Sequence, residues 1–197
     1  MKKLLQPECR VAPAPVVIVS CAGEDGNSNL ITCAWSGNIC SDPPMAFVSI
    51  RPERYSHDLV ISSGEFALNL CSKEMVQAAD ICGMYSGRTT DKWEAASLTK
   101  CLSSEISAPI IEESPISIEC KVRQVIPLGS HDMFIGEIVA IDADEKYIDE
   151  YGRLRLDDAG LLALVHQSYF PLSSSIQNMG YTIRKKTSNT RRKNATR

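Results

Sequence analysis

Short apolar runs rich in β-branched residues alternate with polar turns along the first fifty residues. The run 16–20 is followed by Asp25-Gly26, a pair typical of tight hairpins because both positions tolerate positive φ, and 30–35 is the expected return strand. Ser41-Asp-Pro-Pro44 interrupts regular pairing, since each proline removes a backbone donor, and 45–50 is the next strand. Three strands are therefore expected by residue 50.

Helical spacing replaces this alternation in the following segment. Ser56 is the expected N-cap of a short helix ending at Gly64, and Ser72 is the expected cap of an amphipathic helix. The predicted helices cover 56–64, 73–85 and 91–97, with a strand at 65–70 between the first two.

Two long alternating runs, 116–126 and 134–143, flank the connection Pro127-Leu-Gly-Ser-His131. Strands that come early and late, with helices inserted between them, argue against a doubly wound parallel sheet. The chain also lacks a Gly-x-Gly-x-x-Gly or Walker motif, which disfavours a nucleotide held by either. The sequence predicts a mainly β protein with inserted helices, built on an antiparallel barrel.

Composition fits one compact domain. The chain has 197 residues, 44% of them hydrophobic and 23% charged. It contains no apolar run of roughly eighteen residues and no long apolar stretch at its start, so we expect no membrane span and a cytoplasmic location. The expected domain covers 1–182.

The remaining residues, 183–197, form a basic tail. Seven lysines and arginines and no acid occur there, against a net charge of -3 for the whole chain. Such a tail can bind nucleic acid or anionic lipid. However, no aromatic residue follows Tyr181 to stack on a base, and we expect a solvated, disordered terminus without a nucleic-acid or membrane partner.

The eight cysteines are expected to be reduced thiols, because a chain of this size needs no disulfide staples. No Cys-x-x-Cys pair occurs, and His57, His131 and His166 are far apart in the sequence. We therefore expect no zinc or iron–sulfur site.

Hydroxyl and amide side chains with one small residue gather in a short β-rich stretch, which suits a planar, phosphorylated ligand. The stretch is Ser28-Asn-Leu-Ile-Thr-Cys-Ala-Trp-Ser36, and Ser86-Gly-Arg-Thr-Thr-Asp-Lys-Trp93 and Gly129-Ser-His-Asp-Met-Phe-Ile-Gly-Glu137 follow it. In this order, over roughly residues 13–170, the chain resembles the flavin reductase-like family, and within it the flavoredoxin-type branch. The resemblance implies a Greek-key split β-barrel that binds FMN, with FAD less favoured, and a homodimer.

The resemblance also assigns cofactor-binding residues. The flavin-lining strand corresponds to Asn29, Thr32, Cys33, Ala34, Trp35 and Ser36. Trp35 either packs on the ring or fills the core, and nothing in the sequence indicates a reactive Cys33 thiolate. For the phosphate, Arg51 and Ser56 are the candidates, because a helix start exposes free N–H groups beside them.

Two further positions are catalytic candidates by the same resemblance. Lys92 would direct a cation toward the flavin and raise its reduction potential, and His131 would donate to the ring or position a hydride donor. The alternative for His131 is a loop histidine bonded to Asp132. Tyr169 is a further cofactor-binding candidate that would cover one ring face, although core packing is the favoured role for an aromatic residue at this position.

The favoured function is an FMN-binding oxidoreductase, an NAD(P)H-dependent flavin reductase. The alternative is a flavoredoxin-type carrier that moves electrons between proteins with little NAD(P)H turnover. The expected partner is accordingly a nicotinamide nucleotide or an electron-transfer protein. The sequence leaves open the choice between NADH and NADPH, and the acceptor.

Overall fold

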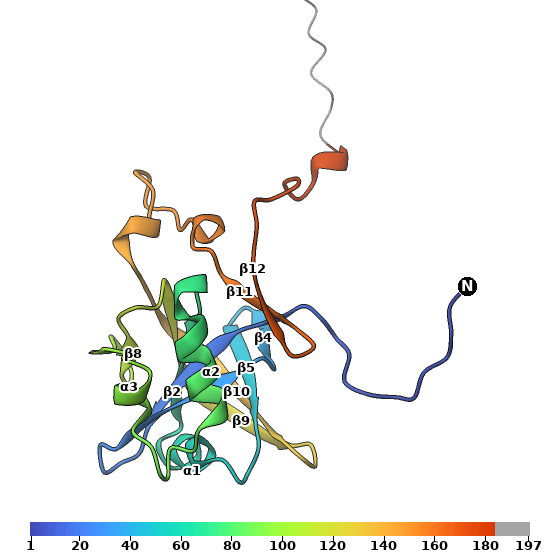
Figure 1. Cartoon of the computed structure of the whole chain (residues 1–197). Coiled ribbons are helices and arrows are strands. Elements are labelled where there is room, and N and C mark those ends of the chain that lie inside the picture. The colour runs from blue at the N-terminus through green and yellow to red at the C-terminus, as the bar shows by residue number, and fades with distance from the viewer. Residues whose placement is uncertain (184–197) are drawn as a thin grey trace, which may run out of the picture.

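A seven-stranded antiparallel sheet forms the body of the protein in a computed structural model that describes residues 1–183 (Figure 1). The strand order is β3-β2-β6-β9-β10-β5-β4. The strands are β2 (Val17–Ala22), β3 (Ser28–Cys33), β4 (Ser36–Ser41), β5 (Pro44–Ile50), β6 (Glu65–Leu70), β9 (Ile116–Pro127) and β10 (Asp132–Ala143).

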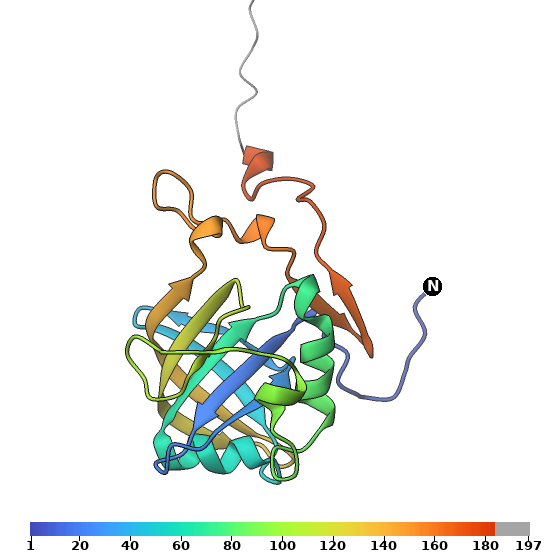
Figure 2. The same cartoon turned by 60° about the vertical axis from the view of Figure 1, so that its left-hand side comes forward.

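The two edges of this sheet meet. Edge strands β3 and β4 are joined by Ala34 and Trp35 alone, and the Ser49 N–H of β5 donates to the Trp35 carbonyl at 2.9 Å. In a flat sheet these edges would lie nearly 30 Å apart at roughly 4.8 Å per strand, whereas three Cα–Cα steps reach only about 11 Å. The sheet is therefore rolled into a split barrel (Figure 2).

Apolar side chains on the concave face fill the barrel. Phe66 and Phe134 are fully buried there, together with Val19 and Val48. A Cβ on Gly136 of β10 would lie 2.9 Å from the Phe66 ring, so only glycine leaves room for this packing. The barrel interior is a packed core, and ligands must bind outside it.

Helices cover one end and one side of the barrel. Helix α1 (Tyr55–Ser63) lies across the lower end in both views (Figures 1 and 2). After a 3₁₀ turn, η1 (Lys73–Met75), α2 (Val76–Met84) packs on the outer face of β2 and β3 through a second apolar cluster. The short α3 (Lys92–Ala95) adds Trp93 to this cluster.

Smaller elements lie outside the barrel. A three-stranded sheet contains β1 (Ala14–Pro15), β11 (Leu162–Val165) and β12 (Ser168–Pro171), and β7 (Lys100–Cys101) pairs with β8 (Ile110–Ile111). The 3₁₀ turns are η2 (Glu145–Tyr147), η3 (Leu156–Asp158) and η4 (Tyr181–Ile183). The first residues of the chain extend away from the barrel (Figure 1). Over residues 1–183, no helix is both long and apolar enough to cross a membrane.

The predicted fold class is confirmed, and most predicted strands are present. Gly64 ends α1 in the left-handed conformation with φ 68°, as expected, and Asp91 caps α3 through its side chain. The structure contains eight free cysteines, five of them buried. The basic tail predicted for 183–197 lies outside the described residues from position 184 onward.

Several element predictions were wrong. Residues 36–41 form β4, which was missed because this edge strand is polar and mostly exposed and so shows no alternation. The pair Asp42-Pro43 is accordingly the turn of the β4–β5 hairpin and not a break in pairing. The loop between β2 and β3 covers residues 23–27, with positive φ only at Gly26, and is longer than a two-residue turn.

The helix starts also differ from prediction. The N-cap position of α1 is Arg54, without a side-chain bond, and Ser56 lies buried in the first turn. The predicted helix 73–85 is divided into η1 and α2. The strands β1, β11 and β12 were not foreseen, because two to four residues are too few to show a periodic pattern.

Candidate functional site

Two adjoining cavities form one groove beside β3. The wide lobe has a volume of about 200 Å³ and the narrow lobe about 80 Å³, and Ile31, Arg54 and Gly83 border both. The wide lobe is further lined by Thr32, Cys33, Ala34, Trp35, Ser49, Ile50, Arg51 and His131. The narrow lobe is further lined by Asn29, Glu53, Tyr55, Ser56, Tyr85, Ser86, Gly87 and Lys92.

The wide lobe has an aromatic wall. The indole of Trp35 is 45% exposed, and its ring centroid lies 4.4 Å from that of His131, with 39° between the planes. Trp35 therefore lines a cavity and is not part of the core. Such a wall suits a flat ring, which gains contact with both aromatic side chains.

His131 is held by its neighbour in the loop. Its Nδ1 lies 2.9 Å from the Ser130 hydroxyl, while Asp132 accepts a hydrogen bond from His57 Nε2 at 2.9 Å. The alternative in which His131 bonds Asp132 is therefore wrong. Instead, the His57–Asp132 pair fixes the loop to α1, and His131 faces the wide lobe.

Burial decides the charge states at the wide lobe. It lowers the pKa of His131, and the positive charge of Arg51 lowers it further. Burial raises the pKa of the Cys33 thiol to about 12. At neutral pH the lobe thus presents a neutral imidazole and a protonated thiol, which disfavours a nucleophilic role for Cys33.

Arg51→Ala is expected to raise the pKa of His131, because a positive charge that opposes its protonation is lost. Glu53→Ala is the matched control with the opposite sign, because the Glu53 carboxylate favours the imidazolium. An NMR titration of the imidazole protons in both variants measures the shifts. Shifts of the same sign would show that these charges do not act on His131.

Lys92 forms the floor of the narrow lobe. Its side chain is buried, and its ammonium donates to the carbonyls of Leu30 and Cys82, both at 2.8 Å. Burial lowers its pKa, and over the described part of the chain it has no carboxylate partner in an ion pair. A buried cation held only by neutral carbonyls is costly, and an anion in the lobe would offset this cost.

Further donors converge on the same lobe. Asn29 and Ser56 are both buried, and the Asn29 amide donates to the Ser56 hydroxyl at 2.8 Å. The first N–H groups of α1 have no acceptor within the helix. Gly87 packs directly on Asn29, since a Cβ there would lie 2.2 Å from its Oδ1. A helix start, a buried ammonium and the Arg54 guanidinium together suit a phosphate.

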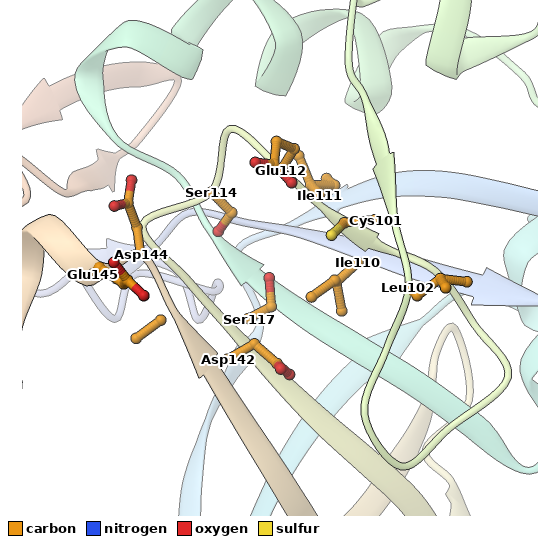
Figure 3. A pocket seen from close by; sticks show the side chains of 11 residues that line it. Cys101, Leu102, Ile110, Ile111, Glu112, Ser114, Ser117, Asp142, Asp144 and Glu145 are labelled. Atoms are coloured by element: carbon orange, nitrogen blue, oxygen red, sulfur yellow. The ribbon is translucent and has the colours of Figure 1, made fainter.

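A larger cavity, of about 430 Å³, lies elsewhere, against β9 and β10 (Figure 3). Four carboxylate side chains border it, from Glu112, Asp142, Asp144 and Glu145. This concentration of negative charge would repel a phosphate. Volume alone therefore does not identify the site, and the chemistry favours the groove beside β3.

The structure brings together most of the predicted site residues, with three exceptions in placement. Arg51 borders the wide lobe with His131 and not the narrow lobe with Ser56, and it lies 3.5 Å from Glu53. Tyr169 of β12 borders neither lobe and packs against the second apolar cluster. Ser36 is buried on the far side of Trp35.

Several residues that line the groove were not chosen as site residues from the sequence. Among them, Arg54 borders both lobes, and Ser86 and Gly87 border the narrow one. The position of Arg54 directly before the start of α1 is the sequence signal that could have selected it. The loop at 86–87 comes close to Asn29 only through tertiary packing.

Comparison with known proteins places this geometry in a family. Residues 9–172 match the family model described as "Flavin reductase like domain". An uncharacterized protein of Aeropyrum pernix is 33% identical over 133 residues, which are 67% of this chain and 51% of that protein. The chain thus spans about half the length of this relative.

Solved structures share the fold. The flavoredoxin of Desulfovibrio vulgaris (Miyazaki F) matches with a TM-score of 0.86 and 28% identity, over 93% of this chain and 100% of that one. An FMN-binding protein from Thermus thermophilus matches with a TM-score of 0.77 and 24% identity, over 90% and 99% of the two chains. The chain belongs to the flavin reductase-like family, a flavin-binding family, and the predicted resemblance is confirmed.

Proposed function

We propose that the groove binds FMN, with the phosphate in the narrow lobe and the flavin ring in the wide lobe, and that the protein is an FMN-dependent oxidoreductase. The observation that carries this proposal is the buried Lys92 ammonium. It donates to two neutral backbone carbonyls, and no carboxylate among the described residues pairs with it. The Thermus relative, which binds FMN by name, supports the choice of flavin.

The bound flavin would supply redox chemistry by accepting two electrons as hydride. The role of the protein's own residues would be to position the flavin ring and to exclude water from it. Trp35 and His131 form the wall of the ring site, and the neutral imidazole can donate or accept one hydrogen bond. No side chain is needed as an acid or base, since close stacking of donor and acceptor supplies much of the catalysis.

We favour an NAD(P)H-dependent flavin reductase, and the match to a family model described as flavin reductase like supports the reductase part of this proposal. The second candidate is an electron carrier between proteins, and the likeness to a flavoredoxin over the whole of that chain supports it. Anaerobic mixing of the FMN-loaded protein with NADH or NADPH separates them. Bleaching of the flavin within minutes is expected for a reductase, and an unbleached flavin favours the carrier.

We also propose a homodimer in solution. Large apolar side chains are exposed on two peripheral elements, Ile39 on β4 and Phe170 on β12, with Leu172 directly after it. An interface would bury these side chains. Sedimentation equilibrium should give twice the chain mass, and a monomer at micromolar concentration would contradict the proposal.

Arg54→Ala is expected to weaken FMN binding by about 1–3 kcal/mol, because a charge-assisted contact between the lobes is lost. Arg123→Ala is the matched control, since Arg123 is also exposed, is paired with Glu137 at 2.8 Å and borders neither lobe. Fluorescence titration of both variants with FMN gives the dissociation constants. Equal values for the two variants would reject a role of Arg54 in binding.

A further inference from the structure

His57 of α1 and Asp132 of β10 form a hydrogen-bonded pair just outside the groove. His57 Nε2 lies 2.9 Å from Asp132 Oδ2, and the two side chains are only 12% and 18% exposed. Because a carboxylate can only accept, Nε2 is the donor. Neither residue borders a lobe, so the pair lies outside the proposed flavin site.

The pair joins two segments of the chain that carry groove residues. Ser56, directly before His57, lines the narrow lobe, and His131, directly before Asp132, lines the wide lobe. The two partners are 75 positions apart in the sequence. One side-chain hydrogen bond therefore links the segment behind the narrow lobe to the segment behind the wide lobe.

Helix α1 is the firmly held side of this link. Leu59 and Val60 of the helix are buried in the barrel core. The His57 ring also packs edge-on against Phe134, with 5.2 Å between the ring centroids and 73° between the planes. This packing fixes the imidazole before any flavin binds, so His57 is a fixed point to which Asp132 is tied.

The loop that carries His131 is the weakly held side. Asp132 is the first residue of β10, and His131 lies just beyond the paired strand. Residues 127–130 of the loop are exposed. Within residues 1–183, the bond donated by His57 is the only hydrogen bond between this loop with Asp132 and α1. Loss of this bond would let the end of the strand fray and would free His131 to leave Trp35.

We propose that His57 and Asp132 are positioning residues for the flavin ring, because their hydrogen bond holds His131 against Trp35 and so keeps the aromatic wall of the wide lobe in place. The hold on His131 stands on contacts within the chain, whereas its effect on flavin binding rests on the proposed function. Loss of the bond weakens contacts to the ring and leaves contacts to the phosphate unchanged. Loss of the Lys92 ammonium has the opposite pattern.

The test compares Asp132→Ala, which removes the acceptor, with Asp132→Asn, which removes the same charge but keeps an amide oxygen for His57 Nε2. The first measurement is the NMR shift of the His131 imidazole protons in FMN-free protein, because the ring current of Trp35 acts on protons this close to it. Trp35→Leu gives the shift without that ring. Asp132→Ala should move the signals most of the way to this value, and Asp132→Asn much less.

The second measurement is the dissociation constant of FMN and of riboflavin for the same variants. Asp132→Ala is expected to raise both constants by the same factor, about three- to tenfold, as for the loss of one hydrogen bond, and Asp132→Asn is expected to raise them less. His57→Leu breaks the pair from the other side and should reproduce both results, which keeps the test open if Asp132→Ala does not fold.

His131 signals that stay in place in Asp132→Ala, or that move equally in both Asp132 variants, would overturn the proposal. Weakening of FMN but not of riboflavin would place the effect in the narrow lobe and would overturn it too, as would unchanged flavin dissociation constants while the signals move. If the signals move as expected but the wild-type protein does not bind FMN, the flavin assignment fails and the hold on His131 stands.

Discussion

Lys92→Met is expected to raise the dissociation constant of FMN about 10- to 100-fold and to raise that of riboflavin much less. The buried ammonium lies under the narrow lobe and has no described carboxylate partner, so a phosphate there gains a charge-assisted contact of about 1.5–3 kcal/mol. Riboflavin has no phosphate, so the substitution removes little of its binding free energy. Parallel titrations with the two flavins measure the difference.

The control for this variant concerns its structural role. Lys92 also ties the carbonyl of Leu30 on β3 to that of Cys82 on α2, and methionine leaves both carbonyls unpaired. Thermal unfolding of the FMN-free variant reports that loss. Equal weakening of FMN and riboflavin would show that Lys92 only supports the fold and has no contact with the phosphate.

Gly87→Ala is expected to weaken FMN binding by about 1–3 kcal/mol. The added Cβ would lie 2.2 Å from Asn29 Oδ1, so either the loop or the Asn29–Ser56 pair must move, and both border the narrow lobe. Gly37→Ala is the matched control, because its Cβ would also meet a close neighbour, the Phe47 ring at 3.2 Å, but Gly37 borders neither lobe. FMN titration compares the two variants, and an effect in Gly37→Ala as large as in Gly87→Ala would contradict this explanation.

The sequence predicts the barrel well because its long strands alternate clearly. The strand at 116–127 alternates apolar and polar residues from Ile116 to Arg123, and this periodicity is visible without a structure. Strand β4 was missed for the opposite reason, since pairing along an exposed edge leaves no apolar pattern. The rolling of the sheet follows from the two-residue link between β3 and β4, which becomes evident only once β4 is known.

The candidate site was predicted where its residues are consecutive and missed where packing assembles it. Residues 32–35 lie together in the wide lobe because they follow one strand. Lys92 was selected by the family resemblance and not by a local pattern, because it is buried only through the packing of α2 on β3 beside it, and composition alone would place such a lysine at the surface. Gly87 meets Asn29 across 58 positions of sequence, which no local pattern encodes.

The most direct test is to purify the protein without added flavin, record its visible absorption spectrum, and titrate cofactor-free protein with FMN. The account predicts yellow protein, release of FMN on denaturation as identified by mass, and saturable binding of one FMN per chain. Colourless protein that does not bind FMN at micromolar concentration would contradict it.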